Sequence, residues 1–291
     1  MSNLGLSTLN NISTLRFIRT FIIWLPGAVV ALLWLFPLYW MLNTSVKPDR
    51  LILAGMDLIP TEITWEHYRT VVADTPVIRW FINSIVTSVC VVAGSLVLGS
   101  LTGFALARMH FPGRTVIFWL LISSLMIPPE MSIVPLFIGV LRLEVQDSFI
   151  SLIIPPLASV FPVYLYRQFF LSFPRELEDA AAIDGCSRLG TFLRVALPLA
   201  RPATLAGAIL IFTSNWNSFL WPLLVAFKTE WKTLPVGMAF YTRLDIQGTS
   251  TQSGYGEAMA AVAIVALPTL IFFLILQRYF IEGVTQVGIK G

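Results

Sequence analysis

Charged side chains are scarce in this chain. Asp, Glu, Lys and Arg together make up 12% of its 291 residues, whereas a soluble domain carries about 25%. Hydrophobic residues make up 56%, and the mean hydropathy is +0.79. This balance excludes an ordinary soluble domain and predicts an integral membrane protein.

Cysteine and histidine are also rare. Cys90 falls inside a long hydrophobic run and Cys186 in a polar connection, so no disulfide is expected between them. His67 and His110 are far apart in the sequence, and we expect each to be a solvated interfacial side chain. The chain is therefore expected to hold no metal and no other cofactor of its own.

Motifs for nucleotide binding and catalysis are missing. No Gly-x-x-x-x-Gly-Lys-Ser/Thr loop is present to bind nucleotide phosphates, so the chain itself is not expected to hydrolyse ATP. An intramembrane enzyme would need a site that the sequence does not show. Glu130 is the one ionisable residue well inside a predicted span, which argues against a proton-coupled pump. A partner ATPase is the economical energy source, while composition alone leaves a channel or scaffold open.

Six hydrophobic stretches are long enough to cross a bilayer core, which takes about 20 helical residues. They lie at residues 21–42, 81–106, 115–138, 148–166, 203–227 and 257–280. We therefore expect an all-α membrane domain of six spans over residues 21–291, after a tail of residues 1–20 whose first 15 residues are loosely ordered. Residues 43–79 are too polar to insert and are expected to form an external cap.

The basic residues predict the orientation of the spans. With the amino terminus in the cytoplasm, the shorter connecting segments on that side hold eleven of the 19 Lys and Arg residues: Arg16, Arg19, Arg108, Arg114, Arg167, Arg175, Arg188, Arg194, Arg201, Arg278 and Lys290. Both termini are then cytoplasmic. The formal net charge of +3 reflects this topology and gives no indication of nucleic-acid binding.

Glycine and proline indicate how the spans pack. Gly94, Gly99 and Gly103 share the second span, where small residues let helix backbones approach closely. Double prolines at residues 128–129 and 155–156 predict a break or kink in the third and fourth spans.

Residues 173–198 form a polar segment with two predicted short helices. Pro174 suits a first helical position, and Glu176, Glu178 and Asp179 complement the positive end of the helix dipole. Asp184 and Gly185 end this helix, Ser187 caps the next one, and Pro198 closes it. The second helix is predicted to carry an apolar face of Leu189, Phe192, Leu193, Ala196 and Leu197 opposite Arg188, Thr191 and Arg194. A plain amphipathic surface loop would show the same spacing.

The same segment resembles the cytoplasmic EAA loop of ABC importer permeases. That pattern is Glu-Ala-Ala, three residues, Gly, nine residues, an aliphatic residue, any residue, Leu and Pro. Here Asp179 replaces the usual Glu, with Glu178 beside it, and the remaining spacing matches. The resemblance implies an ATPase-coupling role for Glu178, Asp179, Ala180, Ala181, Asp184, Gly185, Leu197 and Pro198. We expect a cytoplasmic coupling loop at about residues 167–201 and call its residues 173–198 the EAA segment.

Residues 213–222 make the most polar patch within a predicted span. The stretch from Trp216 to Leu223 resembles a signature of carbohydrate permeases, and amides beside indoles suit a sugar with hydroxyls and a C–H face. Asn215, Trp216, Asn217 and Trp221 are the candidate pathway residues. Hydrogen bonding between helices would explain the amides equally well. Glu130 is a further pathway candidate, or it stabilises a helix end.

The resemblance implies an ABC type I importer permease fold in the cytoplasmic membrane of a bacterium or archaeon, surrounded by lipid. It implies a heterodimer with a homologous permease, two ATPase subunits that bind ATP and Mg, and an external solute-binding protein. The implied substrate is a disaccharide or oligosaccharide. A sugar phosphate, a polyol or a uronate oligomer stays open.

Overall fold

The structure, a computed structural model, describes residues 4–52, 54–55, 57–239 and 254–288, with side chains described between residues 24 and 275. The described residues form helices joined by turns, which confirms the predicted all-helical class. Within these described ranges, three single helices are long and apolar enough to cross a membrane, and three bent pairs bring the number to six if each pair is one span. The described residues fall into two compact units, within 1–71 and 245–263, and within 72–244 and 264–291.

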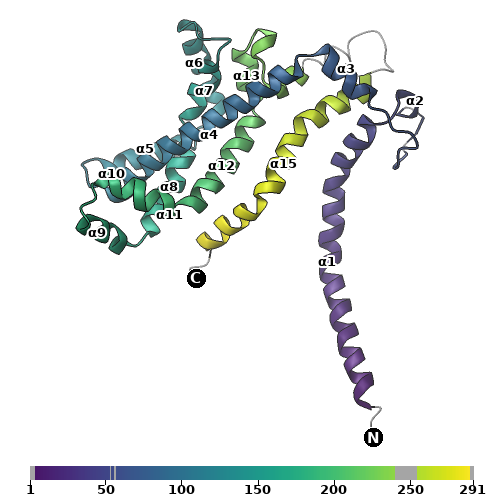
Figure 1. The fold of residues 1–291 in the computed structure, drawn as a ribbon, viewed down its shortest axis with the longest axis horizontal. Helices are drawn as coiled ribbons and strands as arrows, with labels where there is room; N and C mark the ends of the chain where they lie inside the picture. Colours follow the sequence, from purple (N-terminus) through teal and green to yellow (C-terminus); the bar gives the residue numbers. More distant parts are fainter. Residues whose placement is uncertain (1–3, 53, 56, 240–253, 289–291) are drawn as a thin grey trace. The chain divides into compact units, whose positions relative to one another are not determined.

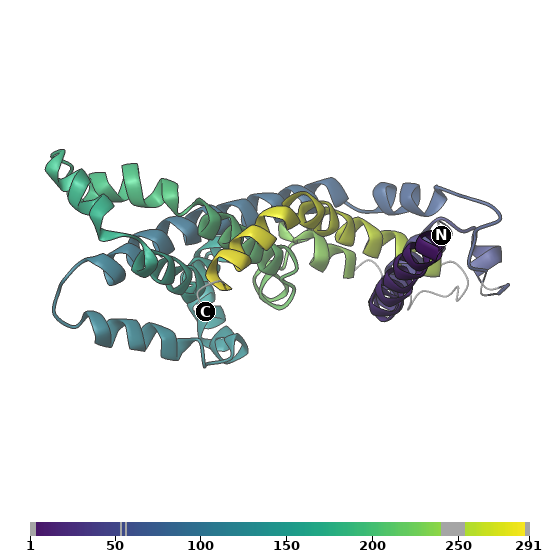
Figure 2. The same cartoon turned by 90° about the horizontal axis from the view of Figure 1, so that it is seen from below.

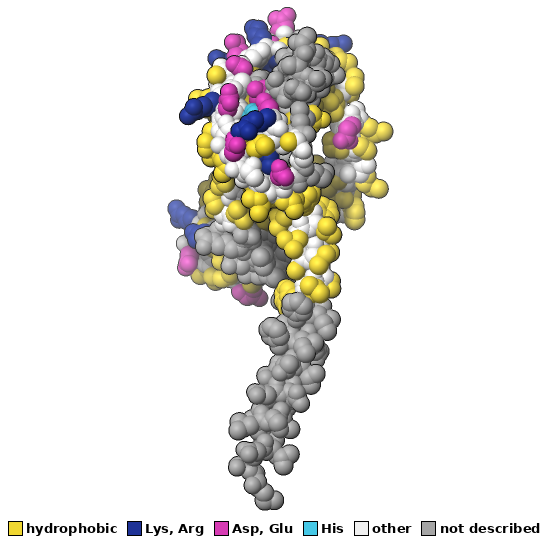
Figure 3. All heavy atoms as spheres, turned by 90° about the vertical axis from the view of Figure 1, so that its right-hand side faces the viewer, with side chains coloured by type: hydrophobic (Ala, Val, Ile, Leu, Met, Phe, Trp, Pro, Cys, Tyr) yellow, Lys and Arg dark blue, Asp and Glu magenta, His cyan; other side chains and the backbone are white. Residues whose placement is uncertain are grey.

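The first unit contains α1 (Leu4–Ser45), α2 (Asp49–Ile52), most of α3 (Glu66–Asp74) and the start of α15 (Gly254–Gly288). Because α1 is helical from Leu4, the expectation of a loosely ordered tail is wrong from that residue on; no proline precedes Pro26 to interrupt the helix. Hydrophobic side chains such as Trp24 and Trp34 are exposed along α1, and charged side chains gather in the predicted external cap, residues 43–79, that follows it (Figure 3). This distribution suits a helix that faces lipid.

The cap is more tightly packed than the sequence predicts. His67 on α3 is 4% exposed, and its Nε2 lies 2.8 Å from the carbonyl oxygen of Lys47. The prediction of a solvated His67 is therefore wrong. The reason is that α3 packs against the end of α1, where the hydroxyls of Tyr68 and Ser45 also meet at 2.8 Å.

In the second unit, α4 (Val77–Arg108) is an unbroken helix of 32 residues, roughly 48 Å long at 1.5 Å per residue. It packs against α8 (Val160–Ser172) and α12 (Arg201–Trp216), as Figures 1 and 2 show. A Cβ on Gly99 would lie 2.4 Å from Cβ of Pro162, and one on Gly103 would lie 2.9 Å from the Arg167 nitrogen. The predicted close approach at the glycines of the second span is thus confirmed.

Two predicted spans are broken where prolines indicated. In the third, α5 (Arg114–Ser124) and α6 (Pro129–Arg142) meet at 97°. In the fourth, α7 (Phe149–Leu157) and α8 meet at 41°, just beyond the double proline of residues 155–156. Breaks of this kind let backbone groups line a cavity within a membrane protein.

The fifth predicted span, residues 203–227, consists of two helices. α12 ends at Trp216, and α13 (Leu220–Val225) follows after a break. Asn217 caps α12 by donating from Nδ2 to the carbonyl oxygen of Thr213 at 2.8 Å, so the polar run supplies the hydrogen bonds that end the helix. The connection that follows contains η2 (Thr229–Trp231) and helical residues 234–239, and residues 240–253 lie outside the described part of the chain.

Candidate coupling and pathway sites

The first half of the EAA segment forms α9 (Arg175–Ile183), as predicted. Pro174 stands at its N-cap, and Glu176 and Glu178 lie in the first turn. At the other end Gly185 has a φ of 79°. The Cys186 nitrogen donates to the Ala181 oxygen at 2.9 Å, and the Gly185 nitrogen donates to the Ala182 oxygen at 3.1 Å. These two bonds are a Schellman motif, which needs the left-handed conformation that glycine adopts without steric cost.

The second half begins as predicted and ends differently. The Ser187 hydroxyl accepts a hydrogen bond from the Gly190 nitrogen at 3.2 Å and caps α10 (Arg188–Thr191). A π-helix, η1 (Phe192–Ala196), and α11 (Leu197–Leu199) continue the run, so Pro198 lies inside it. A bend of 73° then leads into α12. Pro198 cannot donate a backbone hydrogen bond, which favours a widened turn before it.

The buried face of this second half differs in part from the predicted one. Phe192 and Ala196 pack with Phe104 and Phe170, as predicted for the apolar face. Leu189 and Leu193 are nevertheless 59% and 51% exposed, and Thr191 of the predicted polar face is buried. The predicted apolar face is therefore confirmed at Phe192 and Ala196 and wrong at Leu189 and Leu193.

The residues of the EAA motif divide between two faces. Asp179, Ala180, Asp184 and Gly185 are exposed, as is Pro198, and Ile183 among them is 86% exposed. Ala181 is buried and Leu197 is partly buried. The segment therefore presents an acidic and apolar surface on one side and is anchored to the bundle on the other.

Glu178 faces inward and pairs with Arg108 at the end of α4. Arg108 Nε lies 2.9 Å from Glu178 Oε1, and the two side chains are 8% and 23% exposed. The guanidinium also donates to the Phe173 carbonyl oxygen and lies 5.7 Å from the Phe173 ring centroid. Sequence reasoning missed this role of Arg108. The one available signal was its position just after the second predicted span, and that position does not identify its partner.

Asn215 is the candidate pathway residue that lines a cavity in the second unit. The cavity measures about 400 Å³ and lies between α4, the α7–α8 break and α12. Its lining residues are Val91, Pro156, Ser159, Phe161, Leu210, Ile211, Ser214, Asn215 and Ser218. Asn215 Nδ2 also donates to the Ser88 hydroxyl on α4 at 3.1 Å. Asn215 therefore joins two helices and also faces a cavity, so both a pathway contact and an interhelical hydrogen bond are compatible with its position.

The other pathway candidates lie elsewhere. Trp216 is 1% exposed, stacks on Phe212 and donates from Nε1 to the Val265 oxygen at 3.3 Å. Trp221 donates from Nε1 to the Ser151 oxygen at 2.9 Å, which joins α13 to α7. Glu130 is exposed in the first turn of α6, where its charge suits the helix dipole. The structure thus does not bring these three residues to the Asn215 cavity.

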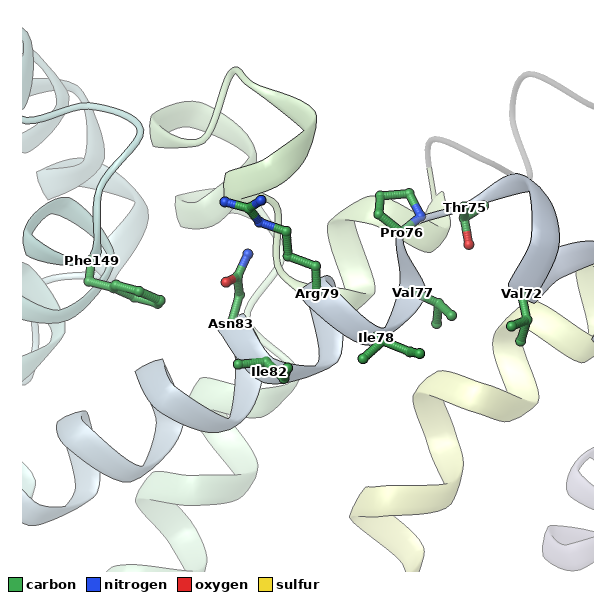
Figure 4. Close-up of a pocket in the computed structure, with 9 residues that line it drawn as sticks. All are labelled: Val72, Thr75, Pro76, Val77, Ile78, Arg79, Ile82, Asn83 and Phe149. Carbon is green, nitrogen blue, oxygen red and sulfur yellow. The ribbon is translucent and has the colours of Figure 1, made fainter.

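A second cavity of about 530 Å³ lies at the N-terminal end of α4 (Figure 4). Phe149 faces it across from Asn83 and Arg79. Both polar side chains are engaged by the connection after α13, because Arg79 Nε and Asn83 Nδ2 each donate to the Glu230 carbonyl oxygen, at 3.0 and 2.8 Å. This end of α4 is therefore fixed to residues 229–232.

Replacing Asn215 with Leu separates its two roles. If Asn215 contacts the passing substrate, Asn215→Leu will reduce uptake or alter substrate preference, whereas Ser88→Ala, which removes only the hydrogen bond between helices, will leave both unchanged. If the amide is structural, both variants will instead destabilise the complex by about 0.6 to 2 kcal/mol, as expected for one interhelical hydrogen bond, and so lower its melting temperature and yield. Uptake and melting measured on one preparation distinguish the outcomes.

Broken apolar helices, a cavity lined by apolar residues, serines and Asn215 at one break, and an exposed acidic segment are features of a multi-pass membrane protein. Residues 95–286 match the family described as the binding-protein-dependent transport system inner membrane component. The arabinooligosaccharides transport system permease protein AraQ of Halalkalibacterium halodurans is 36% identical over 91% of this chain and 94% of its own. The sn-glycerol-3-phosphate transport system permease protein UgpE of Pectobacterium atrosepticum is 31% identical over 87% and 91%.

A solved structure shows the same fold. The crystal structure of a bacterial ABC transporter involved in the import of the acidic polysaccharide alginate contains a chain with a TM-score of 0.76 to this one, at 21% identity over 90% of this chain and 96% of that one. The present chain belongs to the family of binding-protein-dependent inner-membrane transport components. It is a permease subunit of an ABC importer, and such subunits are not themselves enzymes.

Proposed function

We propose that this permease translocates a disaccharide or oligosaccharide that an external binding protein delivers. The observation that carries the proposal is the 36% identity over nearly the whole length to a permease named for arabinooligosaccharides. The Asn215 cavity supports it, since an amide and serine hydroxyls can exchange hydrogen bonds with sugar hydroxyls while apolar groups face the C–H surfaces.

The similarity to UgpE keeps a phosphorylated polyol as the second candidate. A phosphate or uronate is held most strongly by Arg or Lys. Among the described residues, those that line the Asn215 cavity carry no charge. A neutral sugar therefore fits this subunit better than a sugar phosphate or a uronate oligomer.

The EAA segment supplies the proposed contact with a partner ATPase. Its exposed Asp179, Ala180, Ile183 and Asp184 form a surface that could enter a cleft, while Ala181 and Glu178 hold α9 to the bundle. The proposed complex contains this chain, a homologous permease, two ATPase subunits that bind ATP and Mg, and the binding protein. Residues 21–291 would form the membrane domain.

We place both termini and the EAA segment in the cytoplasm, on the distribution of basic residues. Cys186, partly exposed in that segment, reports on this orientation. A membrane-impermeant maleimide added to intact cells is expected to leave Cys186 unlabelled and to label it after permeabilisation of cells that lack the ATPase. Labelling from outside would reverse the topology.

Substrate choice is tested by ATP hydrolysis of the reconstituted complex with its binding protein. The panel contains arabinotriose, maltose, trehalose, sn-glycerol-3-phosphate and an alginate trisaccharide. We expect stimulation by a neutral oligosaccharide or disaccharide. Stimulation by the phosphate or the uronate alone would contradict the proposed substrate class and leave the importer function standing.

A further inference from the structure

α4 contacts three parts of the second unit: the connection after α13, α12 at the Asn215 cavity, and the EAA segment. Near its N-terminus, Trp80 Nε1 donates to the Thr229 oxygen at 2.7 Å. In its middle, Ser88 accepts from Asn215 at the cavity. At its C-terminal end, Arg108 pairs with Glu178 of α9.

The helix is suited to move as one body. α4 contains no proline, unlike α6 and α7, and no break interrupts it (Figure 1). The backbone contacts at Gly99 and Gly103 hold it against α8 over about one turn. A displacement of α4 at the Asn215 cavity would therefore move the C-terminal end of α4 by nearly the same amount. It would move the EAA segment too if that end is attached to the segment.

The attachment is the cluster around Arg108. The guanidinium pairs with the Glu178 carboxylate, donates to the Phe173 carbonyl oxygen and lies beside the Phe173 ring, so it contacts both α9 and the residue that leads into it. Arg suits this arrangement because its planar fork donates in several directions at once. The pair is largely shielded from water, which makes its charges interact more strongly than those of an exposed pair.

We propose that Arg108 is a positioning residue that fixes α9 to α4, so that movement of α4 carries the exposed face of the EAA segment with it. Glu178 then holds the segment from within and does not contact the ATPase, whereas Asp179 and Asp184 remain available to it. This inference rests on the proposed coupling role of the segment.

The test compares Glu178→Gln with Glu176→Gln in the full reconstituted complex. Both changes remove one negative charge from the first turn of α9, but only the first breaks the pair with Arg108. The readout is the ratio of ATP hydrolysis with and without the binding protein, saturated with whichever sugar of the panel stimulates the wild type most. We expect Glu178→Gln to lower this ratio at least about fivefold, the lower end of typical coupling between sites, and Glu176→Gln to leave it unchanged.

A charge exchange distinguishes positioning from simple stability. Arg108→Glu alone places two acids together and should abolish stimulation, whereas Arg108→Glu combined with Glu178→Arg should recover most of the ratio. Size-exclusion chromatography must show assembled complex in each case. Equal ratios for Glu178→Gln and Glu176→Gln, no recovery in the exchanged pair, or loss of assembly in Glu178→Gln would each overturn the inference. The Gly185 variants described in the Discussion test the coupling role itself, so the two failures are distinguishable.

Discussion

A Gly185→Val variant is expected to lose substrate uptake while still inserting into the membrane. Gly185 has a φ of 79°, and a β-branched residue is a severe outlier in that region. A Cβ at this position would meet no heavy atom within 4 Å, so the strain comes from the backbone and not from a clash. The left-handed conformation costs an ordinary residue about 1 to 2 kcal/mol, and relief of that strain would undo the hydrogen bonds that end α9.

The matched control is Gly185→Asn, because Asn tolerates the left-handed region. It should retain most of the uptake and bind the ATPase as the wild type does. Copurification of the ATPase, measured with radiolabelled sugar uptake, separates loss of docking from loss of translocation. Wild-type uptake in Gly185→Val would remove the main support for the proposed coupling role.

Local chemistry allowed the ends of many elements to be predicted. Pro174, Gly185 and Ser187 each act within a few residues of their own backbone, and the structure has α9 and α10 where these residues indicated. The break after α5 follows the same logic, since the residues at 128–129 cannot continue a helix. The polar run at residues 213–218 also indicated a helix end. The apolar residues on both sides of it nevertheless made the whole stretch read as one hydrophobic span.

Contacts between distant residues could not be predicted in the same way. Arg108 and Glu178 are 70 positions apart, and their pairing depends on how α8 packs along α4 and brings α9 to the end of α4. His67 is buried because α3 packs against the end of α1, a tertiary contact that no local pattern reports. Leu189 and Leu193 are likewise exposed because of how this segment packs on the bundle, which helical spacing alone does not report.

The polar patch at residues 213–222 shows a third limit of prediction from the sequence. Hydropathy places Asn215, Trp216 and Asn217 together, yet consecutive helical residues point about 100° apart, so they face different surroundings. Asn215 faces α4 and the cavity, Trp216 is buried against Phe212, and Asn217 caps its own helix. Their proposed pathway roles are therefore best tested one at a time.

A Gly99→Ala change is expected to lower the yield and melting temperature of the complex sharply. The added Cβ would lie 2.4 Å from Cβ of Pro162 and 3.0 Å from its carbonyl carbon. Real Cβ atoms do not approach so closely, and because one of the contacted atoms is backbone, α4 and α8 would have to separate. Overpacking of this kind costs about 1 to 3 kcal/mol, and tight backbone contact is a main source of helix association in membranes.

The control is Gly139→Ala on α6, which adds the same methyl group where no heavy atom lies within 4 Å. Alanine is the better helix former by about 1 kcal/mol, so this variant should match or exceed the wild type in yield. Fluorescence-detected size-exclusion chromatography after graded heating compares the two on equal terms. If Gly99→Ala matched Gly139→Ala, the close approach of α4 to α8 would be contradicted, and with it the rigid path from the Asn215 cavity to Arg108.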